Sequence, residues 1–300
     1  MITYVVSDIF YSPAKVLVNT VNTVGAMGKG LAYQFRQFYP PMYDQYRQLC
    51  EQGQFSIGQL WLYKTPHKWI LNFPTKADWR DPSRLEYLEQ GLQKFVETYA
   101  AKGLTSVSFP MLGAGLGGLD WETMVRPVME RYLHDLPINI YIHLYEPDNP
   151  FALKSDFKTQ KSWLDGLPQV PTFTRFRDEV LDIVRHQSHF ETLDEQSTFS
   201  ASLDEFEERI TLHAANGDSL TVLSESSLSD LWHYLHVSGY CLPQNLPSGL
   251  DQYAPQIVTL LAQLDYIHPV YVSRMQGQRR VGLHFIPPTS EAITAIKVSL

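Results

Sequence analysis

Residues 18–32 read VNTVNTVGAMGKGLA, and this stretch decides the fold. It starts as an apolar run with amide and hydroxyl side chains, passes through three glycines in six residues, and ends in apolar residues at helical spacing. The predicted order is strand, glycine loop, helix. Glycine lets backbone N–H groups approach a phosphate, and a helix start adds partial positive charge. Taken alone, the pattern also fits a plain turn capped by asparagine.

A second stretch of the same kind favours the phosphate interpretation. Residues 106–121 read SVSFPMLGAGLGGLDW, which is an apolar strand, four glycines in six residues, and then Asp120 as the expected cap of the next helix. Two such loops about 80 residues apart suit a diphosphate ligand at the strand ends of an open α/β sheet. Neither has the spacing of a Walker motif or a dinucleotide fingerprint, which argues against an ordinary NTPase or Rossmann dehydrogenase.

Composition sets the class of protein. The chain has 300 residues, 44% of them hydrophobic, which favours two domains. No run of 18 apolar residues occurs and no basic segment precedes an apolar one at the start, so we expect a soluble cytoplasmic protein without a membrane partner. The two cysteines, Cys50 and Cys241, lie far apart, which predicts packing roles, no disulfide and no metal site. We expect no cofactor.

Charge is unevenly distributed along the chain. The net charge is −1 over residues 1–150 and −7 over residues 151–300, which together give the total of −8. A freestanding nucleic-acid binder is usually basic, so the acidic half suits a basic protein partner, or else a solvated acidic surface.

Apolar patterning divides the chain into two parts. It predicts strands near 2–6, 18–22, 59–63, 68–73, 106–110 and 138–144, and helices near 31–38, 42–50, 85–102 and 121–133. This alternation predicts an α/β fold over residues 1–147, with a mixed, largely parallel sheet covered by helices. Residues 148–171 are predicted to be a linker. Residues 172–300, with helices followed by a hairpin, predict a smaller α+β domain, for which a winged-helix-like arrangement is a candidate.

The motifs of residues 1–147 resemble the ADP-ribose-binding pattern of the macrodomain family. The resemblance rests on Asp8-Ile9 after the first strand, on Val18-Asn19 with Asn22, and on the two glycine loops. Four further motifs make the resemblance more specific. They are Gly28-Lys29-Gly30, Tyr63-Lys64-Thr65, Asn72-Phe73-Pro74-Thr75-Lys76 and Leu119-Asp120-Trp121-Glu122, and they are similar to those of DarG antitoxins, the DNA ADP-ribosyl glycohydrolases paired with DarT toxins.

The resemblance implies a set of ligand contacts. Asp8 would bind the adenine, the glycine loops the diphosphate, and Asn22 the hydroxyls of the distal ribose. The full set of implied ADP-ribose contacts is Asp8, Ile9, Asn19, Thr20, Val21, Asn22, Gly28, Lys29, Gly30, Thr75, Gly113, Ala114, Gly115, Leu116 and Gly117. Ala114 and Leu116 stand where the family has cysteine and asparagine, which bears on substrate preference.

Lys76 and Asn22 are the implied catalytic residues. By position alone, Lys76 also fits a salt-bridged surface lysine. A lysine at a strand end beside a cleft can lose its hydration, which lowers its pKa and leaves a neutral amine. Such an amine could attack the opened ribose as an imine or transfer a proton, and the sequence leaves both routes open.

The function implied is that of a DNA ADP-ribosyl glycohydrolase. It would release ADP-ribose from thymine bases in single-stranded DNA, and residues 172–300 would bind and neutralise a DarT-like toxin. Two alternatives remain: a non-catalytic ADP-ribose reader, or a hydrolase of ADP-ribose 1''-phosphate or acyl-ADP-ribose. Lys76 discriminates between enzyme and reader, because a reader needs no amine beside the distal ribose.

Overall fold

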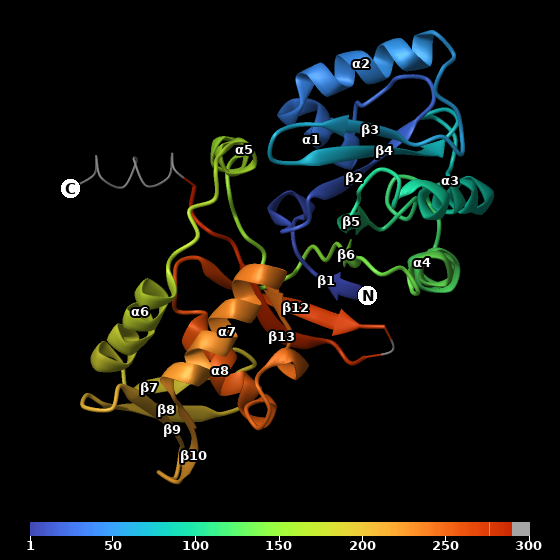
Figure 1. Ribbon diagram of the computed structural model, residues 1–300. Helices are drawn as coiled ribbons and strands as arrows, with labels where there is room; N and C mark the ends of the chain where they lie inside the picture. The colour runs from blue at the N-terminus through green and yellow to red at the C-terminus, as the bar shows by residue number, and fades with distance from the viewer. Residues whose placement is uncertain (276, 290–300) are drawn as a thin grey trace. The chain divides into compact units, whose positions relative to one another are not determined.

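The computed structural model describes residues 1–275 and 277–289, and the chain divides into two compact units (Figure 1). Of the described residues, unit 1 holds 1–148, 155–165 and 274–275, and unit 2 holds 149–154, 166–273 and 277–289. Across the described ranges, no helix is both long and apolar enough to cross a membrane.

Unit 1 is built on a mixed sheet with the strand order β1-β6-β5-β2-β4-β3. The strands are β1 (Ile2–Val5), β2 (Val16–Asn22), β3 (Trp61–Lys64), β4 (Trp69–Lys76), β5 (Ser106–Pro110) and β6 (Asn139–His143). All neighbours are parallel except β3 and β4, which form an antiparallel pair. The predicted mixed, largely parallel sheet is confirmed.

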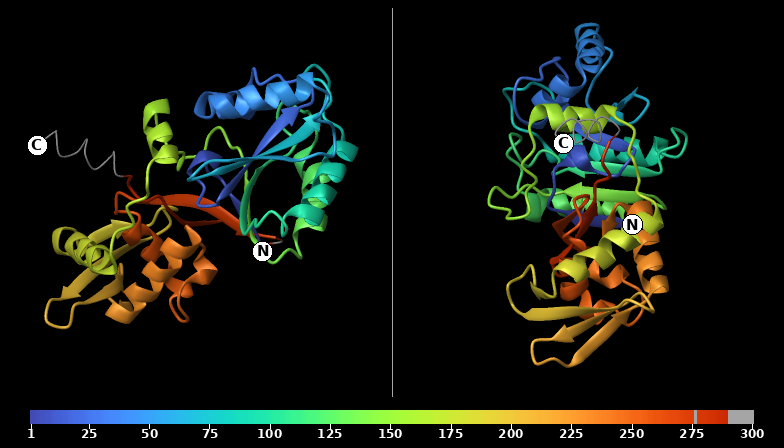
Figure 2. Two further views of the ribbon diagram at one scale, coloured as in Figure 1. Left: turned by 45° about the horizontal axis from the view of Figure 1, so that its top comes forward. Right: turned by 90° about the vertical axis from the view of Figure 1, so that its left-hand side faces the viewer.

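Helices cover both faces of this sheet (Figure 2). They are α1 (Gly30–Phe38) and α2 (Pro40–Glu51) on one face, and α3 (Leu85–Thr98) and α4 (Arg126–Leu133) on the other, with the short turns η1 (Ile9–Tyr11) and η2 (Trp121–Val125). Asp120 caps η2, as predicted, by accepting a hydrogen bond from the Thr123 N–H at 2.7 Å.

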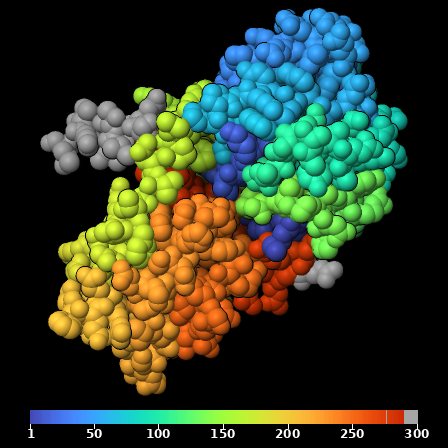
Figure 3. Space-filling model, in the orientation of Figure 1, coloured from blue at the N-terminus to red at the C-terminus, as the bar shows by residue number. Residues whose placement is uncertain are grey.

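Alternation along β2 explains the two faces. Val16 and Val18 are fully buried in the core that contains α3 and α4, whereas Leu17 and Val21 are buried in the core that contains α1 and α2. Successive residues of a strand point to opposite faces, so the first half of this strand, with helices on both sides, is apolar at every position. In the space-filling view, the blue atoms of α2 lie above the cyan atoms of the β3–β4 hairpin (Figure 3).

The segment predicted as a linker contains a helix that belongs to unit 1. This helix is α5 (Phe157–Asp165), and its Leu164 is 2% exposed within the core of α1 and α2. The Phe157 ring stacks on Phe38 with the ring centres 4.8 Å apart. Residues 155–165 are therefore part of the first unit's packing.

Unit 2 combines three longer helices with two sets of strands. The helices are α6 (Phe173–His186), α7 (Glu225–Ser238) and α8 (Ala254–Leu261), with short turns η3 (Pro243–Asn245) and η4 (Asp251–Tyr253). Strands β12 (Ile267–Arg274) and β13 (Arg280–Phe285) form the predicted hairpin, and β11 (Tyr240–Cys241) pairs with β13. Residues 290–300 of the predicted domain lie outside the described residues.

A second sheet in unit 2 was not predicted. It has the antiparallel order β10-β9-β8-β7, formed by β7 (His189–Glu191), β8 (Thr198–Asp204), β9 (Arg209–Ala214) and β10 (Ser219–Leu223). These strands are short and polar on one side, with Phe199 and Ala201 of β8 buried between exposed or half-exposed neighbours. The unit is α+β, as expected, but this sheet has no counterpart in the winged-helix-like arrangement.

Candidate active site

The predicted site residues gather at one edge of the unit 1 sheet. They follow the carboxyl ends of parallel strands: Asp8 and Ile9 after β1, Thr20 to Gly30 at the end of β2, Thr75 and Lys76 at the end of β4, and Gly113 to Gly117 after β5. Ligands of open α/β sheets bind outside this edge. The two loops are named here the first glycine loop (residues 25–30) and the second glycine loop (residues 113–118).

The two predicted catalytic residues are partners across neighbouring strands. Asn22 of β2 pairs with Lys76 of β4, after a register shift between Val21 and Asn22. Lys76 is half-buried, and its Nζ donates to the Leu116 carbonyl of the second glycine loop at 2.8 Å. The strand register therefore places Lys76 beside Asn22 along the backbone, and its amine lies against the second glycine loop.

The first glycine loop is shaped by Asn22. Its Nδ2 donates to the Ala26 carbonyl at 2.6 Å, and its Oδ1 accepts the Val24 and Ala26 N–H groups, each at 3.1 Å. The Tyr46 hydroxyl donates to Asn22 Oδ1 and to the Asn22 carbonyl. Asn22 is 6% exposed, so its carboxamide mainly braces the loop in this structure.

The second glycine loop is held by the backbone. The Ser83 N–H donates to the Gly117 carbonyl at 2.9 Å, and the Leu119 N–H donates to the Gly113 carbonyl at 3.1 Å. A Cβ built on Gly117 would lie 2.2 Å from the Gly113 carbonyl oxygen, so only glycine fits there. Gly113 has φ +66°, a left-handed conformation that also favours glycine.

The two glycine loops meet. A Cβ built on Gly30 would lie 3.0 Å from Leu116 Cδ1, so the Leu116 side chain reaches across to the start of α1. Leu116 is nevertheless 68% exposed. Gly28 and Gly115 are exposed and have open space beside them, which leaves room for an anion near the backbone N–H groups of both loops.

Asp8 forms the other end of the site. It is solvent-exposed, and its Oδ1 caps η1 by accepting the Phe10 N–H at 2.9 Å. Its Oδ2 accepts Nε2 of Gln160 at 2.6 Å. Burial among neighbouring atoms raises the pKa of this carboxyl, and the two N–H donors act in the opposite direction.

Several predicted contacts lie below the surface. Ile9, Val21 and Thr75 are buried, and Thr20 is half-buried. Asn19 is fully buried, and its Nδ2 donates to Asn72 Oδ1 at 2.9 Å. The structure thus uses the Asn19 side chain to join β2 to β4, whereas the sequence had placed it among the ligand contacts. Lys29 is exposed at the residue that precedes α1.

The enclosed lysine is Lys68, which the sequence did not single out. It is 9% exposed, and its Nζ donates to the carbonyls of Ser12 at 2.6 Å and Ala14 at 2.8 Å. Burial lowers its pKa to about 7. His143 at the end of β6 is also buried, which lowers its pKa to about 4. Lys68 directly precedes β4, and nothing in the sequence around it indicates that its side chain is buried.

Metal-binding groups are not brought together. Within residues 1–275 and 277–289, no three His, Cys, Asp or Glu side chains converge in a way that could hold a metal ion. The polar groups that face the site are backbone N–H groups of the two loops, the Lys76 amine and the Asp8 carboxylate, which suit a phosphorylated sugar ligand. The Asn22 carboxamide is used within the first glycine loop.

Comparisons with known proteins agree with this geometry. Residues 18–128 match the Macro domain family. The DNA ADP-ribosyl glycohydrolase of Thermus aquaticus is 41% identical over 157 residues, which are 51% of this chain and 43% of that protein. A DNA ADP-ribosyl transferase–DNA ADP-ribosyl glycohydrolase fusion protein of Thermosipho africanus is 36% identical over 156 residues, or 46% of this chain and 40% of the fusion.

Among solved structures, the macrodomain of Mycobacterium tuberculosis DarG is 40% identical, with a TM-score of 0.47, over 49% of this chain and 99% of that one. The chain spans less than half the length of the curated DNA ADP-ribosyl glycohydrolases it matches. Residues 18–128 contain both glycine loops and the carboxyl ends of β2, β4 and β5, whereas Asp8 lies before them. Unit 1 of this chain is therefore a macrodomain, similar in sequence to those of the DarG DNA ADP-ribosyl glycohydrolases.

Proposed function

We propose that unit 1 releases ADP-ribose from thymine bases of single-stranded DNA. The observation that carries the proposal is the pairing of Asn22 with Lys76, whose Nζ lies 2.8 Å from the Leu116 carbonyl of the second glycine loop. A binding module has no use for an amine held at the second glycine loop, beside the proposed diphosphate site. The similarity to curated DNA ADP-ribosyl glycohydrolases supports hydrolysis of an ADP-ribose link to DNA; thymine and the single strand are part of the proposal.

The proposed reaction breaks the bond between the anomeric carbon of the distal ribose and a thymine nitrogen. Hydrolysis adds one water: the hydroxyl goes to the carbon and the hydrogen to the nitrogen. The two glycine loops would hold the diphosphate and Asp8 the adenine, so binding energy fixes the reacting carbon beside Lys76. In one route the Lys76 amine would attack the anomeric carbon of the opened sugar and expel thymine, which leaves with a proton; one water would then hydrolyse the imine to ADP-ribose and the free amine. In the other route Lys76 would transfer a proton during ring opening, and water would displace thymine.

The direct test is release of ADP-ribose from a single-stranded oligonucleotide that carries ADP-ribosyl-thymine. Chromatography of the products should show free ADP-ribose together with the unmodified oligonucleotide. Tight binding of ADP-ribose without turnover would support the reader instead. Turnover only of ADP-ribose 1''-phosphate or acyl-ADP-ribose would support the third function.

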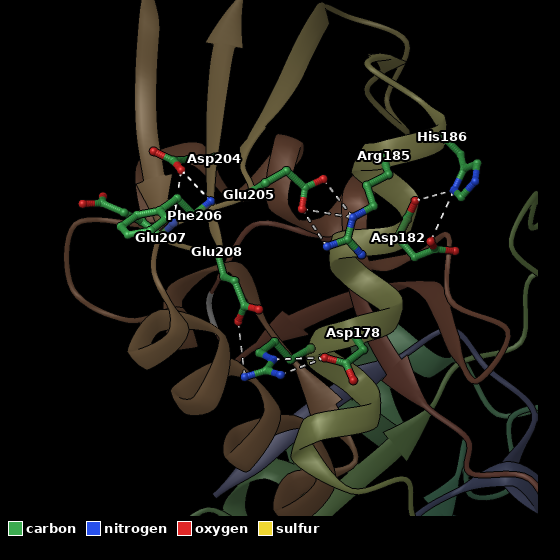
Figure 4. A network of polar contacts seen from close by, with 10 residues as sticks. Asp178, Asp182, Arg185, His186, Asp204, Glu205, Phe206, Glu207 and Glu208 are labelled. Atoms are coloured by element: carbon green, nitrogen blue, oxygen red, sulfur yellow. Dashed lines mark hydrogen bonds and ion pairs between the residues drawn. The ribbon is translucent and has the colours of Figure 1, made fainter.

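We also propose that unit 2 binds a DarT-like toxin. Residues 151–300 carry a net charge of −7, and the Thermosipho africanus relative joins a DNA ADP-ribosyl transferase to the glycohydrolase in one chain. The turn between β8 and β9 presents Phe206, which is 97% exposed, among acidic residues (Figure 4). Glu205 in this turn is paired with Arg185, and Glu208 with Arg177, so the turn is braced against α6.

The full chain with Lys76→Ala tests this second role, because it removes the proposed catalysis while unit 2 is unchanged. It should still bind the toxin and protect cells from it, and association should slow as salt rises. A matched Phe206→Ala change should weaken binding. A catalytically dead chain that neither binds nor protects would leave unit 2 without a role in neutralisation.

A further inference from the structure

Helix α5 packs beside the proposed adenine end of the site. Its Trp163 ring lies 5.2 Å from the ring of Tyr11 in η1, the turn that Asp8 caps. Leu164 and Phe157 fix the same helix to the core of α1 and α2. With three apolar anchors in nine residues, α5 holds its remaining inward side chain in a defined place.

That inward side chain is Gln160. It is 9% exposed, and its Nε2 donates to Asp8 Oδ2 at 2.6 Å. The other carboxylate oxygen, Oδ1, is taken by the Phe10 N–H. A carboxylate oxygen has two acceptor sites, so Oδ2 can accept one further donor from the solvent side, where Asp8 is exposed.

We propose that Gln160 is a specificity-determining residue of the nucleobase subsite, where it aims the Asp8 carboxylate so that Oδ2 accepts an amino N–H of the base. This inference rests on the proposed function, which places the nucleobase at Asp8. It predicts preference for a 6-amino purine over a 6-oxo purine, because an ionised carboxylate can accept from an amino group but repels a carbonyl oxygen.

The electrostatics of Asp8 show why the glutamine matters. Although solvent reaches Asp8, the protein atoms packed around its carboxyl remove part of the hydration and raise the pKa, while the Phe10 and Gln160 N–H donors lower it. A carboxyl that gained a proton could donate to a 6-oxo group, and selectivity would fall. Loss of the Gln160 donor removes one of the two hydrogen bonds that favour the ionised form.

Calorimetry on the full chain tests the proposal with two ligands, ADP-ribose and inosine diphosphate ribose. Gln160→Leu should weaken ADP-ribose binding by about threefold to tenfold, less than the worth of a full charge-assisted hydrogen bond because the contact from Asp8 to the base survives. The same variant should weaken binding of inosine diphosphate ribose less, so that the ratio of the two affinities becomes smaller. Gln160→Glu, which keeps the shape and sets a carboxylate against Asp8, should have the larger effect.

Two controls separate this inference from the proposed function. Lys158→Leu changes an exposed residue of the same helix and should alter neither affinity. Asp8→Ala should weaken ADP-ribose binding, and adding Gln160→Leu to that variant should cause no further loss of affinity. If Asp8→Ala weakens binding but both Gln160 variants match the original chain, the role of Gln160 is overturned while the proposed function stands.

Two other results would count against the proposal. If Gln160→Leu weakens binding of both ligands equally, and by the same factor in the Asp8→Ala background, Gln160 is a purely structural residue. Full affinity of Asp8→Ala for ADP-ribose would remove the nucleobase from this end of the site, and the inference would fail with that part of the proposed function. Circular dichroism of each variant confirms that the fold is kept.

Discussion

Each end of strand β4 carries a lysine, and the two lysines have different surroundings. Lys68, before the amino end, is enclosed and donates to the carbonyls of Ser12 and Ala14. Lys76, at the carboxyl end, is half-buried beside Asn22 and the second glycine loop. The amino end is closed by protein, whereas the carboxyl end opens between two loops. Substitution of Lys68 should therefore change the stability of unit 1, whereas substitution of Lys76 should change turnover.

The largest expected effect is on turnover at the carboxyl end. Lys76→Ala should slow release of ADP-ribose from DNA by about 10²–10⁴-fold, the range expected for a positioned proton-transfer group. Affinity for free ADP-ribose should stay within about threefold, because the amine is assigned to the reaction and not to ligand binding. Single-turnover assays and calorimetry on the same preparation provide the two measurements.

Lys76→Arg is the matched control. It keeps a positive charge that can still donate to the Leu116 carbonyl, but a guanidinium holds its proton at any assay pH. It should be nearly as inactive as Lys76→Ala. Full activity in either variant would contradict the role given to Lys76, and a large loss of binding would make it a phosphate or ribose contact.

The second effect is on binding at the same end. Gly115 is exposed with open space around its Cβ position, so Gly115→Glu should fold. Its carboxylate would face the diphosphate, and we expect affinity for ADP-ribose to fall by about 100-fold or more through charge repulsion. The Gly115→Gln side chain has the same length without the charge, so this variant should lose much less affinity for ADP-ribose. Equal affinities for all three chains would make this loop only a structural turn.

The carboxyl end of β4 was predictable from sequence, and the amino end was not. The glycines of both loops and the Asn-Phe-Pro-Thr-Lys run form contiguous signals, because the strand-to-helix turns that build this edge are local. Lys68 is buried by carbonyls of Ser12 and Ala14, more than 50 residues away in sequence. Gln160 reaches Asp8 over 152 residues and from the segment that was predicted to be a linker. Contacts of this range leave no local pattern.

At the amino end of β4, the expected effect is on stability. Lys68→Met should destabilise unit 1 by about 1–3 kcal/mol at pH 8, because the buried carbonyls of Ser12 and Ala14 lose their donor. Activity per folded molecule should not change, since Lys68 is not part of the proposed site. Urea unfolding and the oligonucleotide assay measure the two properties. Loss of turnover in fully folded Lys68→Met would contradict the claim that Lys68 acts only on stability.

The remaining effect at the amino end is a dependence of stability on pH, and its sign follows from the proton count. Burial lowers the pKa of Lys68 to about 7 in the folded chain, whereas an unfolded lysine has a pKa of about 10.4. Between these values the unfolded state holds one more proton, so the free energy of unfolding should rise with pH. The amine that remains has two N–H groups, enough for both carbonyls.

Subtracting the values for Lys68→Met isolates this contribution above pH 6. The charge of Lys68 also lowers the pKa of His143, but that group titrates at lower pH. The advantage of the original chain over the variant should be constant below pH 6 and grow between pH 7 and 9 by at most about 1.4 kcal/mol per unit. His143, whose pKa burial lowers to about 4, contributes only at lower pH. A constant difference up to pH 9 would mean that Lys68 stays charged in the folded chain, so that the amino end of β4 tolerates an enclosed ammonium without losing its proton.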